Sequence, residues 1–290
     1  MRFLRLFGLL PLLVTGCPGD GSGGDLSVGT PSREVIFQDG FELGKIGPGW
    51  TGFAINPETD PPENSDSIDI VTDPVREGNY ALKITVHPED AVASGDLLHH
   101  KQRAELFRKN VYTVAGYTLG EEAREGTEYW YSWSVLIPND FPTPDSDDWQ
   151  VMGQWHDQPD PGQPGTGYGP PISVRFRVES TGPSFRVAYG RSDYGETLQN
   201  LDTPVEKGKW IDLVFLIRFS QVSDGFLEVW KDGVPLQTAD GATRITGPNM
   251  YNAQPNSFRL GLYRGGNQTT TSVLYYDDVK IYRNGTPPTP

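Results

Sequence analysis

The stretch ISVRFRVESTGPSFRVAYGR, residues 172–191, has the pattern of two β-strands joined by a tight turn. In its first half, Ile172, Val174 and Phe176 alternate with polar residues, so one face is apolar and the other is polar. Ser-Thr-Gly-Pro at 180–183 is a turn signal, and the alternation resumes at residue 184. The stretch therefore predicts an antiparallel hairpin with one face against a hydrophobic core.

The same strand-like pattern recurs at short spacing along the chain. It covers residues 80–87, 129–137, 210–220, 225–236, 257–265 and 273–283, which are rich in β-branched and aromatic residues. Helical periodicity is scarce, and residues 119–125 are the best candidate for a short helix. The pattern predicts an all-β fold, a two-sheet antiparallel β-sandwich of the jelly-roll, concanavalin-like type. We expect its concave side to form a groove that can hold an extended polymer.

The two ends of the chain suggest the domain boundaries. Residues 1–17, MRFLRLFGLLPLLVTGC, combine a basic start, a short apolar run and small residues before Cys17, as bacterial lipoprotein signals do. The apolar run is too short for a transmembrane helix. Residues 18–33 are rich in Gly, Ser, Pro and Asp and predict a flexible linker. We expect one jelly-roll domain over residues 34–283 and a disordered tail over 284–290.

The signal also predicts where the protein resides. Cleavage before Cys17 would leave this residue lipidated, and an ordinary secretory signal with an incidental cysteine is the alternative. We expect a bacterial cell-envelope protein that is held at the outer membrane by a lipid anchor. Cys17 is the only cysteine, which excludes a catalytic thiol and a disulfide within the domain. A formal net charge of −14 argues against nucleic acid as a partner, and we expect a monomer.

Four strand-like segments carry polar faces of an unusual composition. Because residues i and i+2 of a strand share a face, each segment can be divided into an apolar and a polar side. The polar sides consist of Lys101, Arg103 and Glu105; Gln154 and His156; Arg175 and Arg177; and Arg259 and Tyr263 with Gly261 between them. Any one of these faces could be a solvated exterior. Together they favour a binding site, in which Gly261 would leave room for a ligand.

These side chains fit the cleavage of a uronic-acid polysaccharide by β-elimination. The proton on the carbon beside the carboxylate can leave only when donors neutralise that carboxylate, and Arg103 and Gln154 are suitable donors. One group must take the proton and another must protonate the leaving oxygen, and His156 and Tyr263 are candidates in either order. This chemistry requires no cofactor. The remaining polar residues are predicted to bind substrate: Lys101, Glu105, Arg175, Arg177 and Arg259.

Three motifs in chain order resemble a known family. QRAEL (102–106), QWH (154–156) and FRLGLYRG (258–265) are similar to motifs of jelly-roll polysaccharide lyases, especially the heparin lyase I-like and glucuronan lyase group. Jelly-roll alginate lyases share the pattern more distantly. The resemblance covers roughly residues 34–283 and implies that Arg103, Gln154, His156 and Tyr263 form the active site. It also implies a basic residue four before the tyrosine, which is Arg259 here, where heparin-cleaving members are expected to have lysine.

A calcium site is a separate prediction from the two ends of the domain. FQDGFE (37–42) and YYDDVKIY (275–282) are similar to the terminal strands that meet at a structural Ca²⁺ in many lectin-like sandwiches. Asp39 and Asp277 would be the ligands, since a buried carboxylate needs a partner and Ca²⁺ prefers oxygen ligands. Two solvated acids at a sheet edge are the alternative.

Two other functions compete with the lyase. ETDPPE (58–63) has the carboxylate spacing of some glycosidases, but Pro61 and Pro62 are incompatible with the central strand that such a pair requires. A carbohydrate-binding module on the same fold could hold the sugar with Arg and Tyr and leave it intact. Such a module has no need for Gln, His and Tyr at one point, and the sequence therefore favours the lyase.

Overall fold

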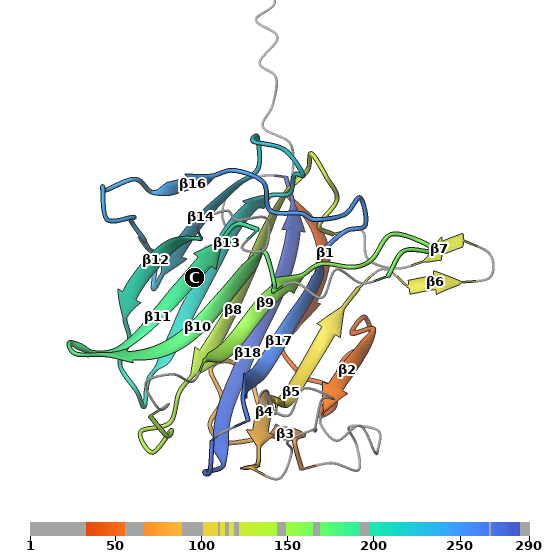
Figure 1. Ribbon diagram of the computed structural model, residues 1–290. Helices are drawn as coiled ribbons and strands as arrows, with labels where there is room; N and C mark the ends of the chain where they lie inside the picture. Colours follow the sequence, from red (N-terminus) through yellow and green to blue (C-terminus); the bar gives the residue numbers. More distant parts are fainter. Residues whose placement is uncertain are drawn as a thin grey trace, which may run out of the picture. The chain divides into compact units, whose positions relative to one another are not determined.

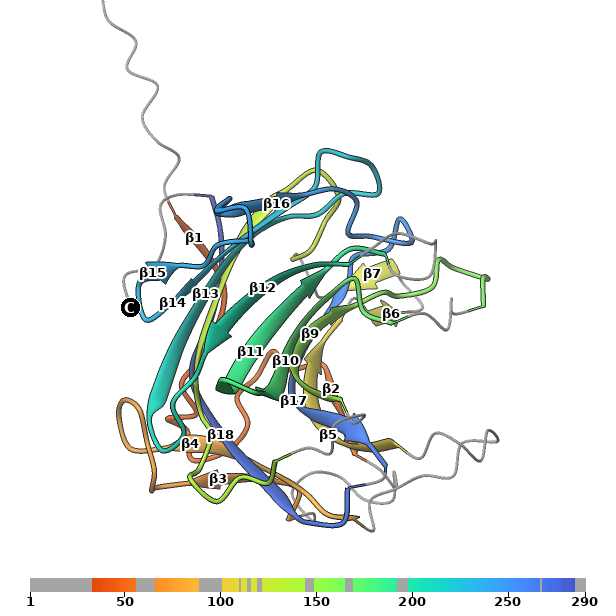
Figure 2. The same cartoon turned by 60° about the vertical axis from the view of Figure 1, so that its left-hand side comes forward.

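The computed structural model describes residues 33–55, 66–88, 101–109, 111–113, 116–118, 122–143, 149–164, 169–191, 198–266 and 268–284. These residues belong to one unit of the chain, Pro31–Pro290. They form two large antiparallel sheets, and Figure 2 shows the sheets as two curved layers, one nested inside the other. The predicted two-sheet β-sandwich is confirmed. Within these ranges no helix is long and apolar enough to cross a membrane.

The inner layer is a seven-stranded sheet with the order β12-β11-β10-β9-β17-β5-β2 (Figure 1). Its outward side is called the concave face below. The strands are β2 (Gly52–Ile55), β5 (Lys101–Arg108), β9 (Gln150–His156), β10 (Ile172–Glu179), β11 (Gly182–Tyr189), β12 (Gln199–Pro204) and β17 (Ser257–Gly265).

The outer layer is a nine-stranded sheet with the order β15-β14-β13-β8-β18-β4-β3, in which β1 also pairs with β18 and β16 with β14. Its strands are β1 (Glu34–Asp39), β3 (Ile68–Val71), β4 (Ala81–Val86), β8 (Glu128–Leu136), β13 (Trp210–Arg218), β14 (Phe226–Lys231), β15 (Val234–Pro235), β16 (Arg244–Thr246) and β18 (Ser272–Arg283). A separate short pair consists of β6 (Val111–Thr113) and β7 (Gly116–Thr118).

The predicted hairpin forms β10 and β11. The strands pair from Ile172 opposite Tyr189 to Glu179 opposite Gly182, so only Ser180 and Thr181 connect them. The second strand therefore begins two residues before the predicted start at residue 184, because Gly182 and Pro183 already join the ladder.

The core between the sheets is strongly aromatic. Trp133 and Phe215 of the nine-stranded sheet stack with ring centroids 4.5 Å apart. Trp155 and Phe258 of the seven-stranded sheet pack against Trp133 at 5.8 and 5.5 Å and are fully buried. Because Trp155 points into this core, the residues before and after it in β9 point to the concave face. The core thereby fixes the direction of Gln154 and His156.

The predicted helix at residues 119–125 is wrong over its described part. Glu122 to Glu125 form bends and a turn, and Ala123 has a φ of 59°, which a helix does not allow. The carboxylate of Glu122 instead lies 2.8 Å from Nε of Arg108 in a buried ion pair. This contact with a distant strand outweighs the weak local helix propensity.

Candidate active site

Four neighbouring strands bring the predicted site residues to the concave face. The segments that carry them are β10, β9, β17 and β5, which lie side by side in this order. The apolar residues between them are buried, among them Ala104, Leu106, Val174, Leu260 and Leu262. The predicted polar residues therefore face away from the core and share one surface.

The register places these side chains directly beside one another across the strands. Tyr263 pairs with Arg103, and Arg259 pairs with Gln154. The guanidinium carbon of Arg103 lies 5.3 Å from the centre of the Tyr263 ring. The ammonium of Lys101, one row further along β5, lies 5.9 Å from the same ring. Two cations thus flank the tyrosine.

Glu105 lies beneath this cluster and orients Gln154. It is almost fully buried, and its Oε1 accepts a hydrogen bond of 2.5 Å from Nε2 of Gln154. Its Oε2 lies 4.0 Å from Nε of Arg103, which is beyond hydrogen-bond range. The carboxylate therefore holds the amide and offsets part of the positive charge around it.

Several buried polar atoms of this cluster have no hydrogen-bond partner among the described residues. They are Nε of Arg103, Nε of Arg259, Oε1 of Gln154 and Oε2 of Glu105. Burial lowers the pKa of the Arg259 guanidinium, because removal from water disfavours its charged form. Buried polar groups in proteins are normally paired. An anion bound on this face would supply acceptors to the two guanidinium groups.

A β-bulge shapes the sheet between Tyr263 and Arg259. Pairing of β17 with β9 shifts between Leu260 and Tyr263, and Gly261 has a φ of 147°. A Cβ on Gly261 would lie 2.2 Å from the carbonyl oxygen of Ala104, so only glycine fits. The structural reason for Gly261 is this close approach of the β5 backbone, which corrects the expectation that it leaves room for a ligand.

The bulge is held from the opposite sheet. Tyr276 of β18 is fully buried, and its hydroxyl lies 2.8 Å from the carbonyl oxygens of both Met152 and Gly261. These two residues are the bulge positions of β9 and β17. The core-facing side of the site is thus fixed by a side chain of the nine-stranded sheet.

Further basic residues continue the concave face on β10 and β11. Burial, together with the nearby charges of Arg177 and Arg186, lowers the pKa of the Arg175 guanidinium. Nε of Arg175 donates a hydrogen bond of 3.0 Å to the hydroxyl of Ser173. Arg177 is half-exposed and lies 3.3 Å from Glu179. This row of cations suits a polymer that carries repeated negative charges.

A model of the polysaccharide lyase family matches residues 41–280 of the chain. The chain belongs to the polysaccharide lyase family. The predicted membership and enzyme class are thereby confirmed. A search of curated proteins found no match.

Solved structures share the fold of this lyase at low sequence identity. Endo-β-1,4-glucuronan lyase from the fungus Trichoderma reesei matches with a TM-score of 0.55 and 16% identity, covering 87% of this chain and 94% of that one. The catalytic domain of a glycoside hydrolase family 131 protein from Coprinopsis cinerea gives 0.55 and 14%, covering 88% and 96%. Alginate lyase vAL-1 from Chlorella virus gives 0.47 and 12%, covering 86% and 99%. A lyase and a hydrolase are thus equally similar, so the fold alone does not select the reaction.

The sequence interpretation missed two residues of the candidate site. Trp149 packs edge-on against Tyr263 with ring centroids 4.6 Å apart. Asp157 places its carboxylate 2.9 Å from Nδ1 of His156. Asp157 follows His156 directly, and strict alternation would turn it to the other face. The strand ends at His156, however, and the chain is then free to fold the aspartate back.

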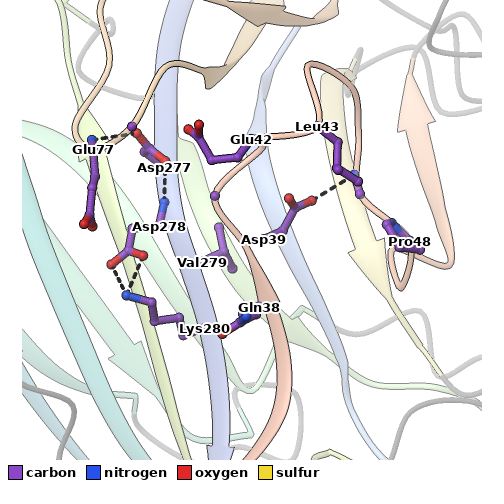
Figure 3. A pocket seen from close by; sticks show the side chains of 13 residues that line it. Gln38, Asp39, Glu42, Leu43, Pro48, Glu77, Asp277, Asp278, Val279 and Lys280 are labelled. Atoms are coloured by element: carbon purple, nitrogen blue, oxygen red, sulfur yellow. Dashed lines mark hydrogen bonds and ion pairs between the residues drawn. The ribbon is translucent and has the colours of Figure 1, made fainter.

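The acidic residues predicted to bind calcium line a pocket beside β1 and β18 of the nine-stranded sheet (Figure 3). The pocket encloses about 630 Å³, and none of its lining residues belongs to β5, β9, β10 or β17. Asp39 accepts hydrogen bonds from the amides of Phe41 and Gly47 and from the indole of Trp50.

Asp277 accepts backbone N–H groups in a similar way, from Arg76, Glu77 and Asp278. Burial nevertheless raises the pKa of the Asp277 carboxyl. Across the described ranges, no three His, Cys, Asp or Glu side chains are grouped so as to hold a metal ion. N–H donors explain the burial of both carboxylates, and the calcium site stays a prediction.

Several predicted features lie outside the described residues. These are Cys17 and the signal, the linker up to residue 32, the carboxylate motif at 58–63 and the tail from residue 285.

Proposed function

We propose that this lyase cleaves a uronic-acid-containing polysaccharide by β-elimination on the concave face. The observation that supports the proposal is a pair of buried donors, Nε of Arg103 and Nε of Arg259, that lie beside Tyr263 and Gln154 and have no hydrogen-bond partner in the described part of the chain. A uronate carboxylate would supply acceptors for these donors. Charge-assisted hydrogen bonds of this kind are about twice as strong as neutral ones.

The donors would also lower the barrier of the reaction. When the proton on C5 of the uronate leaves, the negative charge spreads onto the carboxylate. Fixed guanidinium and amide donors stabilise that charge without reorganising. Glu105 keeps the Gln154 amide in place through its hydrogen bond of 2.5 Å.

The elimination itself needs one proton acceptor and one proton donor. The C5 proton moves to the acceptor, and the C5–H electron pair becomes the C4–C5 double bond. The bond from C4 to the bridging oxygen breaks, and that oxygen keeps the electron pair and takes a proton from the donor. His156 and Tyr263 are the two groups on this face that fit these roles. Exchange with water afterwards restores both groups.

A panel of uronate polymers tests the proposal. Glucuronan, alginate and heparin-like chains would each be incubated with the protein while the ultraviolet absorbance of the unsaturated product is followed. A rise on at least one polymer is expected. Binding without any rise on the whole panel would instead favour a carbohydrate-binding module, and glycans without uronate serve as the control.

We further propose that Cys17 anchors the lyase to the outer membrane through a lipid. The motif before Cys17 supports this proposal. The native protein should partition with membranes, and Cys17→Ser should block processing or release the protein. A soluble protein with a mature N-terminus elsewhere would contradict the lipid anchor.

A further inference from the structure

His156, the last residue of β9, lies next to the carboxylate of Asp157, which has no part in the elimination as proposed above. Nδ1 of His156 lies 2.9 Å from Oδ1 of Asp157 and 3.0 Å from the Asp157 carbonyl oxygen. The Asp157 side chain is 3% exposed, whereas the imidazole is 26% exposed. Nδ1 of the ring thus contacts the protein, whereas no contact of Nε2 is found in the described part of the chain.

The loop after His156 has anchoring contacts besides the one that Asp157 makes. Asn252 donates a bond of 2.7 Å to the carbonyl of Gln158, and its bond to Oδ2 of Asp157 is longer, at 3.3 Å. Nε2 of Gln158 donates to the carbonyl of Pro255, and Asp160 accepts the amide of Gln254 at 3.0 Å. Three contacts that do not involve the Asp157 carboxylate thus hold the loop.

The contact determines what His156 can do. The carbonyl oxygen of Asp157 can only accept a hydrogen bond, so it keeps the ring proton on Nδ1, because a neutral imidazole carries only one N–H. Oδ1 of Asp157 makes no hydrogen bond to the ring and acts on it through its charge. The lone pair is then on Nε2, which can accept a proton. When it does, the ring becomes positively charged, and the adjacent carboxylate stabilises that charge more than a neutral acceptor would.

We propose that Asp157 is a positioning residue that makes His156 the proton acceptor of the elimination and leaves Tyr263 as the proton donor. This inference rests on the proposed β-elimination. Asp157 acts through His156 and does not touch the sugar. The carboxylate of Asp157 also lies within electrostatic range of Arg259, which is part of the donor cluster.

Activity measurements separate this role from loop anchoring. Asp157→Asn keeps the shape and removes the charge, so kcat should fall about 10- to 100-fold, as the loss of a carboxylate next to the charged ring implies, with little change in KM. Asp160→Asn, a matched change in the same loop, should leave kcat unchanged. In a His156→Gln background, Asp157→Asn should have no further effect on kcat. Equal effects of the two Asn variants, or an undiminished effect in that background, would overturn the proposal.

A second measurement needs neither substrate nor activity. The ¹⁵N shifts of the His156 ring, assigned by comparison with His156→Gln, report which nitrogen of the neutral ring carries the proton. We expect it on Nδ1 in the wild type, and a changed Nδ1 shift in Asp157→Asn but not in Asp160→Asn. A proton on Nε2 in the wild type would overturn the assignment. Because no polysaccharide is present, this result is independent of whether uronates are the substrate.

Discussion

The outward faces of the two sheets are both polar, but their charges are arranged differently. On the nine-stranded sheet, Arg76 pairs with Asp212 through two hydrogen bonds of 3.1 and 2.8 Å, and Arg244 pairs with Glu228 at 2.6 Å. On the concave face of the seven-stranded sheet, Nε of both Arg103 and Arg259 is buried without a partner among the described residues.

We interpret this difference as the one between a solvated face and the proposed binding face. Paired surface charges contribute little to stability and need no ligand. Buried donors without partners are unfavourable in the isolated protein and become favourable when an anion supplies acceptors. Substitutions on the concave face should therefore change catalysis, and matched substitutions on the other face should not.

Tyr263→Phe should have the largest effect. The ring would keep its packing against Trp149 and Arg103, and only the hydroxyl is lost. Turnover should fall by about 10²–10⁴-fold, as is typical for a lost general acid or base. Steady-state kinetics on the best uronate polymer measures this. Tyr275→Phe on the nine-stranded sheet is the control, and equal activities of the two variants would remove the distinction between the faces.

Gln154→Ala should follow in size. The amide would stabilise charge that develops in the transition state, so kcat should fall by about 10²–10³-fold, while KM changes less. Glu105 would also lose the donor at its Oε1. Measuring kcat and KM separately checks this split. A variant that raises only KM would make Gln154 a general binding residue.

Tyr276→Phe probes the link between the two sheets. It removes the single hydroxyl donor that the carbonyls of Met152 and Gly261 share, which should reduce the free energy of unfolding by about 1–3 kcal/mol. If the bulge positions the site, kcat should fall as well. Tyr189→Phe removes a similar buried bond, from its hydroxyl to the carbonyl of Gly247, and should reduce stability without lowering kcat. Thermal unfolding and steady-state kinetics of both variants show whether the loss of the Tyr276 hydroxyl lowers kcat in addition to stability.

Arg175→Ala should have the smallest effect of the series. Arg175 lies further along the concave face and should contribute to substrate binding, so KM should rise about tenfold, or about 1.4 kcal/mol. Arg186→Ala is the matched comparison, because Arg186 is already paired with Asp202 at 2.7 and 2.8 Å. A larger change in KM for Arg186→Ala than for Arg175→Ala would mean that an ion pair within the protein does not exclude an arginine from substrate binding.

Much of the prediction from the sequence depended on the alternation of apolar and polar side chains along the strands. A strand with a period of two sends Trp155 into the core and Gln154 to the other side, so the polar faces could be predicted without coordinates. The sequence predicted a two-sheet sandwich, but it did not predict which strands are neighbours in each sheet. In the structure, the packing of the aromatic core fixes the direction in which these side chains point.

Features that depend on distant contacts could not be predicted this way. The Gly261 bulge lies against the backbone of Ala104 in a neighbouring strand, and Glu122 leaves a helical pattern to pair with Arg108. Asp157 joins His156 because a strand ends there, and strand ends are the least certain part of a sequence prediction.

The most direct test of the central claim is the mass of the products released from a purified uronate oligosaccharide. β-Elimination adds no water, so the fragment with the new unsaturated end should be one water lighter than the same fragment from hydrolysis, and Tyr263→Phe should release almost none of it. Products at the full hydrolytic mass with saturated ends would contradict β-elimination on the concave face.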